Sequence, residues 1–232
     1  MLPLADENLR GRGYALVTLA FIAINVIVFV LIQLPSEAFT YGWSTVPREI
    51  TTGTDIVGRE RIGDAFIELT RGPSPIQLTL LSSMFMHGGW LHLLGNMLFL
   101  WIFGDNVEHA MGSVIYLAFY LVAGLVGSLA HVFVDPSSIV PSLGASGAIS
   151  GVLGAYIVLF PSNRVLVVFG YFATWVPALL VIGLWAVLQF VSGIGQIAVT
   201  SQTGGVAYMA HIGGFVAGLI GGVIARSLGR HR

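Results

Sequence analysis

Four polar side chains in an otherwise apolar chain have the types and the order that acyl transfer requires. They are His92 and Asn96 in the stretch HLLGN, Ser146 in GASG and His211 in AHIGG. A serine hydroxyl becomes a nucleophile when a base takes its proton, and imidazole suits that task because it titrates near neutral pH. We therefore expect Ser146 to be the nucleophile and His211 to be the general base and general acid.

A tetrahedral intermediate also needs hydrogen-bond donors directed at its oxyanion. His92 and Asn96 are four residues apart and so share one helix face, from which their side chains could supply two donors. The backbone N–H groups of Ala145 and Ser146, at a helix start, could supply others. The acidic residues on the helix of His92 come at its far end, in FGDNVEH. The sequence therefore predicts a Ser/His dyad with an oxyanion hole.

The composition is that of an integral membrane protein. Of 232 residues, 56% are hydrophobic and 9% are charged, whereas soluble domains carry about 25% charged residues. The formal net charge of -1 excludes a basic surface of the kind that binds nucleic acid. The sequence has no cysteine and no His-Glu-x-x-His zinc motif, so we expect neither a metal nor a cofactor.

Six segments are apolar enough to cross a membrane as helices, which takes about twenty residues each. They are residues 14–34, 90–109, 113–134, 146–161, 165–191 and 206–226. The first is too long for the core of a cleaved signal peptide, so we expect it to be retained. The sequence therefore predicts an all-α membrane protein with a six-transmembrane-helix bundle over residues 14–226. A long structured loop, residues 35–89, is expected between the first two helices.

The arginines predict the orientation of this bundle. Outside the long loop, they lie in or beside the short tails, residues 1–13 and 227–232, or in the turn before the fifth span. Because positive residues favour the cytoplasmic side, we expect both termini in the cytoplasm of a multi-pass protein of the cell membrane. The second, fourth and sixth spans then run inward, which places the four polar side chains near the outer face at similar depth.

At these residues the sequence resembles the rhomboid family of intramembrane serine proteases. The resemblance runs from VPREI in the long loop to AHIGGFVAG in the last span, and it includes HLLGN and GASG. It implies that Ser146 and His211 form the catalytic dyad, and that His92 and Asn96 contribute to the oxyanion hole with backbone near Ser146. It also implies substrates that are transmembrane proteins, cut in or near their membrane segments within the lipid bilayer.

Other residues of these motifs are expected to be structural. Small residues at four-residue spacing let membrane helices approach closely, and such glycines accompany both members of the expected dyad. The stretch FGDNVEHAMG resembles the structural turn that follows the second span in the family. We therefore expect structural roles for Gly144, Gly147, Gly214, Gly218 and Glu108.

The chain departs from some family members in two places. Where those members have an aromatic residue stacked on the catalytic histidine, four positions after the nucleophile, this chain has Ser150, so the resemblance names no residue that orients the imidazole. The long loop also lacks their Trp-Arg pair, although His87 matches a recurrent loop histidine. The fifth span, residues 165–191, and the loop at residues 192–205 are candidate gating elements.

Each motif alone has a structural explanation, and two other functions compete with proteolysis. Small residues such as Gly147 and Gly151 are common packing devices, and a lone His or Asn can bond across helices. A rhomboid-like pseudoprotease that chaperones membrane clients would lack the nucleophile or the base, and both are present here. A small transporter would line its pathway with His and Asn, but it would show internal repeat symmetry, which this sequence does not.

Overall fold

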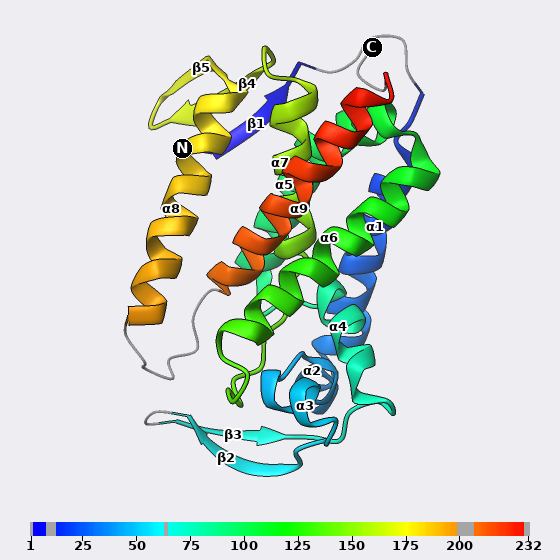
Figure 1. The fold of residues 1–232 in the computed structure, drawn as a ribbon, viewed down its shortest axis with the longest axis vertical. Helices are drawn as coiled ribbons and strands as arrows, with labels where there is room; N and C mark the ends of the chain where they lie inside the picture. Colours follow the sequence, from blue (N-terminus) through cyan, green and yellow to red (C-terminus); the bar gives the residue numbers. More distant parts are fainter. Residues whose placement is uncertain (1, 8–12, 63–64, 199–206, 230–232) are drawn as a thin grey trace.

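The computed structural model describes residues 2–7, 13–62, 65–198 and 207–229, and this part of the chain is mostly helical (Figure 1). Its longer helices are α1 (Leu16–Ile27), α5 (Trp90–Met111), α6 (Ser113–Val134), α7 (Ser146–Leu159), α8 (Ala178–Ala198) and α9 (Tyr208–Ser227). α1 continues directly into a π-helical stretch, η1 (Val28–Gln33). Among the described helices, three are long and apolar enough to cross a membrane: Leu16–Gln33, α6 and α9.

The chain between η1 and α5 folds into short elements that gather at one end of the bundle (Figure 1). These are α2 (Glu37–Trp43), α3 (Pro47–Thr52), the hairpin of β2 (Gly58–Ile62) and β3 (Ala65–Leu69), η2 (Ile76–Leu78), α4 (Thr79–Ser82) and η3 (Ser83–Phe85). Thr45 and Ser142 exchange backbone hydrogen bonds, and the Gly144 N–H donates to the Ser83 carbonyl at 2.9 Å. This segment therefore holds the backbone that leads directly into α7.

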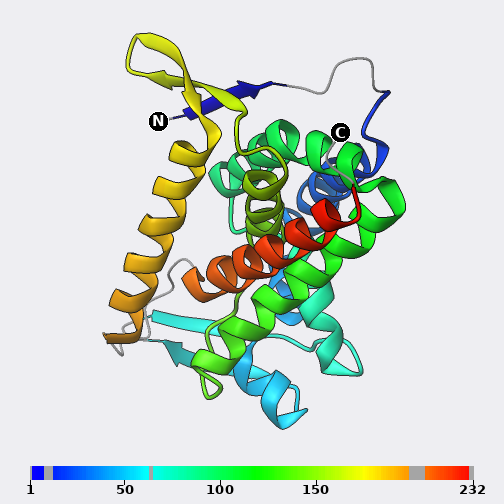
Figure 2. The ribbon, with the colours of Figure 1, turned by 45° about the horizontal axis from the view of Figure 1, so that its top comes forward.

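α7 is the central helix, and it packs against α5, α6 and α9 (Figures 1 and 2). Its small residues allow a close approach to α9. A Cβ placed on Gly214 would collide with the carbonyl of Gly147, and one on Gly218 would collide with the carbonyl of Gly151. Backbones this close are typical of membrane helices that pack through small residues. The α7–α9 contact brings the first turns of both helices together.

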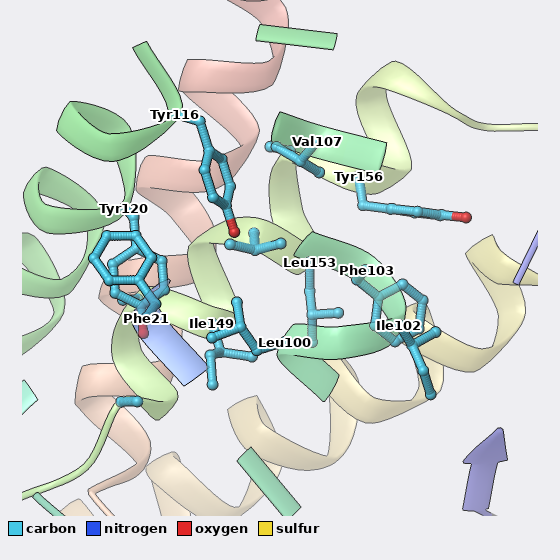
Figure 3. Close-up of a cluster of buried hydrophobic side chains, with 14 of the residues drawn as sticks. Phe21, Leu100, Ile102, Phe103, Val107, Tyr116, Tyr120, Ile149, Leu153 and Tyr156 are labelled. Atoms are coloured by element: carbon cyan, nitrogen blue, oxygen red, sulfur yellow. The ribbon is translucent and has the colours of Figure 1, made fainter. Parts of the chain in front are cut away.

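The side chains on the remaining faces of α7 belong to an aromatic core shared with α1, α5 and α6 (Figure 3). Phe21 stacks on Tyr120 with ring centroids 4.0 Å apart, and Phe103 meets Tyr156 edge to face at 5.0 Å. Such ring pairs add to the stability gained by burying the rings. The core therefore fixes α7 on the side opposite to α9.

Glu108, near the end of α5, joins that helix to the start of α1. Its buried carboxylate accepts hydrogen bonds from the backbone N–H groups of Val17 and Thr18, at 3.1 and 2.8 Å, and from the Thr18 hydroxyl at 2.8 Å. The Ser113 hydroxyl also donates to it, at 2.7 Å. The first N–H groups of a helix have no partner within it, so Glu108 satisfies the start of α1 and fixes it against α5.

A three-stranded antiparallel sheet lies at the other end of the bundle (Figures 1 and 2). It consists of β1 (Leu2–Asp6), β4 (Arg164–Phe169) and β5 (Phe172–Pro177), with β4 in the middle. Asp6 Oδ2 accepts a hydrogen bond from Asn106 Nδ2 at 2.7 Å and one from the Tyr156 hydroxyl at 2.6 Å. Burial raises the pKa of Asp6 to about 6. The strand at the start of the chain thus links α5 to α7.

The expected fifth span at residues 165–191 is wrong in its first half. A β-hairpin that turns at Gly170, with φ +60°, comes first, and α8 begins only at Ala178. The stretches RVLVVF and FATWVP are rich in β-branched and aromatic residues, which favour strands, and hydropathy alone does not separate an apolar strand from a helix.

In the same region the structure also differs from the expected loop at residues 192–205 and from the expected all-α fold. α8 continues to Ala198, into the expected loop at residues 192–205, of which residues 199–205 lie outside the described part of the chain. The fold is mostly helical with two small sheets rather than all-α.

Candidate active site

Ser146 and His211, the expected nucleophile and base, lie in contact. The His211 Nε2 atom is 2.7 Å from the Ser146 hydroxyl oxygen. Ser146 is the first residue of α7 and is partly exposed, whereas His211 is buried one turn into α9. The close packing of these two helices therefore places an imidazole nitrogen at hydrogen-bond distance from the hydroxyl of a partly exposed serine.

The second ring nitrogen of His211 bonds to a residue that the sequence analysis missed. His211 Nδ1 lies 2.6 Å from Oε1 of Gln189, on α8. The only signal in the sequence was an amide within an apolar run, and an amide was not among the expected partners of His211. Ser150, at the position where some relatives carry an aromatic residue, donates its hydroxyl to the Ser146 carbonyl at 2.6 Å instead. An amide from a third helix therefore lies at hydrogen-bond distance from the imidazole.

His92 lies beside the Ser146 hydroxyl, next to Gly144. The Gly88 N–H donates to His92 Nδ1 at 3.3 Å, so in the neutral ring Nε2 carries the proton and is a donor. Gly144 has φ +143°, and a Cβ built there would lie 3.0 Å from His92 Nε2 and 3.4 Å from Ser146 Oγ. The donor and the hydroxyl therefore face the same small space, which a side chain at Gly144 would fill.

Asn96, one turn along α5 from His92, has a buried amide nitrogen. Its Nδ2 atom has no hydrogen-bond partner among the described residues. Buried donors without a partner are rare in folded proteins. Asn96 Nδ2 is thus a buried donor on the same face of α5 as His92, and no described residue pairs with it.

His87 supports His92 from the loop before α5. Its ring meets that of His92 edge to face with centroids 5.1 Å apart. Its backbone makes two hydrogen bonds with the side-chain amide of Gln33. The His87 N–H donates to Gln33 Oε1 at 2.8 Å, and Gln33 Nε2 donates to the His87 carbonyl at 3.2 Å. Burial lowers the pKa of His87 to about 3, so the ring is neutral at physiological pH. His87 thus packs against His92 without adding charge.

Comparison with known proteins identifies the family. Residues 76–228, which include all of the site side chains except Gln33, match the model of the Rhomboid domain. The chain belongs to the rhomboid family. The matched region begins before α4 and ends with α9, so it contains the contacts between α7, α8 and α9 described above.

Three curated rhomboid relatives come from a fungus, a bacterium and a plant. "Rhomboid protein 1, mitochondrial" of Saccharomyces cerevisiae is 28% identical over 218 residues, which are 92% of this chain and 54% of that protein. "Rhomboid protease GluP" of Bacillus subtilis is 46% identical over 85 residues, 37% of this chain and 16% of the relative. "RHOMBOID-like protein 5" of Arabidopsis thaliana is 32% identical over 145 residues, 62% of this chain and 43% of the relative. The chain thus spans about half or less of the length of these relatives.

Proposed function

We propose that this rhomboid protein is an intramembrane serine endopeptidase that cuts peptide bonds in or near the transmembrane segments of other membrane proteins. The observation that carries the proposal is the 2.7 Å hydrogen bond between Ser146 Oγ and His211 Nε2. Two further donors, the imidazole of His92 and the unpartnered amide of Asn96, lie on the neighbouring α5. A nucleophile, a base and oxyanion donors are the groups that acyl transfer needs.

In the proposed reaction, Ser146 Oγ attacks the substrate carbonyl while His211 Nε2 takes the hydroxyl proton. The oxyanion accepts hydrogen bonds from His92 Nε2, from Asn96 Nδ2 and from the backbone N–H groups of Ala145 and Ser146 at the start of α7. His211 then gives the proton to the leaving amine as the C–N bond breaks, which leaves an acyl-enzyme on Ser146. Water, with His211 again as the base, hydrolyses the ester and restores the serine.

We propose six spans in a cell membrane: α1 with η1, α5, α6, α7, α8 and α9. β4 and the end of α9, which carry Arg164 and Arg226, lie at the end of the bundle that carries β1 (Figure 1). α7 begins with Ser146 on the side of the segment between η1 and α5, where the Gly144 N–H donates to the Ser83 carbonyl. Since positive residues favour the cytoplasm, both termini are cytoplasmic and the site faces the outside. A substrate helix must unwind there, because its carbonyls are engaged in hydrogen bonds, so small or helix-breaking residues are expected near the cut.

The test is labelling with a fluorophosphonate, which forms a covalent bond with an activated serine. Detergent-purified wild type, Ser146→Ala and Ser150→Ala are compared, and each is also incubated with a model transmembrane substrate. Ser150 is the matched control because it lies one turn along α7 and its hydroxyl donates to a backbone carbonyl. We expect wild type and Ser150→Ala to be labelled and to cut, and Ser146→Ala to do neither. Wild type that binds the substrate without labelling or cutting would instead be a pseudoprotease.

A further inference from the structure

Gln189 reaches the candidate dyad from a helix that is otherwise largely exposed. α8 lies at the edge of the bundle (Figure 1), and its neighbouring side chains Leu188, Phe190 and Val191 are each more than half exposed. Polar side chains in membrane helices are costly and are commonly functional. The Gln189 amide is directed at His211, with Oε1 2.6 Å from Nδ1.

Contacts on either side of Gln189 fix the face that α8 turns toward α9. Trp185, four residues earlier, has its ring 6.0 Å from that of His211 and 6.1 Å from that of Phe215. Gly193, four residues later, has the ends of Met209 and Ile212 so close that a Cβ there would collide with them. Residues four apart lie on one helix face, so these contacts hold Gln189 in register with His211.

The Gln189 amide oxygen determines which ring nitrogen of His211 carries the proton. Oε1 can only accept a hydrogen bond, so the proton of neutral His211 must be on Nδ1, where it donates to Gln189. Nε2 then presents its lone pair to the Ser146 hydroxyl, which is the tautomer that a general base requires. With no acceptor at Nδ1, the proton would also occupy Nε2, and that form of the ring cannot take the serine proton.

We propose that Gln189 is a positioning residue that holds His211 in the tautomer and orientation needed for proton transfer from Ser146. This inference rests on the proposed function, because it assigns Gln189 a role in that reaction. An amide from α8 thus occupies the place that the acid of a triad has in other serine hydrolases, and it does so without a charge. Within the described part of the chain, the other titratable groups near His211 are Tyr208 on its own helix, His92 on α5 and His131 on α6.

The decisive variant is Gln189→Met, which keeps an unbranched side chain of similar length and removes the oxygen acceptor. We expect kcat to fall about tenfold to a hundredfold, with KM nearly unchanged. This loss is at or below the lower end of the contribution of a general acid or base, about 10²–10⁴-fold, because His211 itself is still present. Leu188→Met is the matched control, since it introduces the same residue at the adjacent exposed position of α8. An equal loss of kcat in Leu188→Met, or no loss in Gln189→Met, would overturn the proposal.

Gln189→Glu tests the role of the acceptor, because a carboxylate keeps an oxygen opposite Nδ1 and also stabilises the imidazolium. We expect Gln189→Glu to recover activity relative to Gln189→Met, with the acid limb of the kcat profile shifted to higher pH than in wild type. An acid limb that stays in place would show that the side chain at position 189 does not contact His211, and would overturn the proposal. Failure of Gln189→Glu to exceed Gln189→Met at any pH would also count against the proposal.

A measurement without substrate separates this inference from the proposed function. In protein labelled with ¹⁵N-histidine, protonated and unprotonated ring nitrogens resonate far apart, and the His211 signals are assigned from their loss in His211→Asn. We expect wild type to show a protonated Nδ1, and Gln189→Met to show a mixture of tautomers. The same tautomer in both proteins would overturn the positioning role even if fluorophosphonate labels Ser146. A tautomer that depends on Gln189 in a protein that fluorophosphonate does not label would uphold the contact and refute the protease.

Discussion

At the scale of single residues, the candidate site contains some polar groups with hydrogen-bond partners and a buried donor without a partner among the described residues. Both nitrogens of His211 have partners at hydrogen-bond distance. The Asn96 amide nitrogen has none among the described residues, although it is buried. A buried donor without a partner lowers the stability of the resting protein, so its presence is explained if an oxyanion supplies the partner during the reaction.

The absence of a partner for Asn96 Nδ2 predicts how Asn96→Ala will change turnover and stability. Loss of one oxyanion donor typically costs about 2.7–4 kcal/mol of transition-state stabilisation, or about 10²–10³ in kcat. Because the Nδ2 donor is unpartnered at rest, we expect the melting temperature of the variant to stay within a few degrees of that of wild type. Turnover of a transmembrane substrate and thermal unfolding in detergent would be measured on the same preparation. A strongly lowered melting temperature with normal turnover would show that Asn96 is structural.

Individual residues of the candidate site differed in how readily the sequence predicted them. Ser146, His211, His92 and Asn96 were predicted as a group because each belongs to a motif whose residue type limits its chemistry. Gln189 was not predicted, because its meeting with His211 depends on how α8 is placed against α9, 22 residues later in the chain. Spacing within one helix can be read from sequence, whereas a contact between two helices requires the fold.

At the scale of elements, the α7–α9 contact determines whether the dyad can form. Both helices present glycines to each other, and the backbones approach so closely that a Cβ on Gly218 would meet the carbonyl of Gly151. Helix order and the limits of α6 followed from apolar length, because a run of about twenty apolar residues has few alternatives in a membrane. The hairpin before α8 could not be predicted from apolar length, since its strands are as apolar as a membrane helix would be.

Gly218→Ala tests the contact between α7 and α9. Alanine favours a helix over glycine by about 1 kcal/mol, but overpacking a tight contact costs about 1–3 kcal/mol, and a backbone carbonyl cannot move aside as a side chain can. We expect a net loss of stability of about 1–2 kcal/mol and reduced turnover, measured by thermal unfolding and substrate cleavage. Gly183→Ala on α8 is the control, because no atom lies within 4 Å of a Cβ at that position. Equal stability of the two variants would contradict the proposed tight contact.

At the scale of the whole molecule, the two ends of the bundle are built differently. The end with Ser146 is covered by short helices and a hairpin, and the opposite end is closed by the sheet that contains β1 (Figure 1). Asp6 is the polar centre of the closed end, since it accepts hydrogen bonds from both Asn106 and Tyr156. The ends of α5 and α7 therefore depend on a carboxyl group from the first strand.

The raised pKa of Asp6 gives this end a dependence on pH. The pKa of the group rises from 3.8 to about 6 on folding, mainly through burial, so the folded protein binds more protons than the unfolded one between these values. Stability is therefore expected to fall as pH rises from about 4 to about 6, and to be insensitive to this group above that range.

Asp6→Asn should remove this dependence. Its side-chain oxygen can accept both existing hydrogen bonds without a charge, so we expect a gain of about 1 kcal/mol above pH 7, or about 2–4 °C in melting temperature. Thermal unfolding would be followed in detergent from pH 4.5 to pH 8, with Glu7→Gln as the control on the adjacent, more exposed residue. A gain that is equal at every pH, or absent at pH 8, would contradict the raised pKa.

The glycine contact between α7 and α9 also bears on how a genetic screen of this protein should be interpreted. Positions such as Gly151, Gly154 and Gly214 have no room for a side chain, so substitutions larger than alanine there should abolish activity as completely as substitutions of Ser146. A library selected for activity alone would therefore show two intolerant classes that look alike. Scoring the amount of folded protein in the membrane beside activity would separate them, because only variants of the glycine class should lose both.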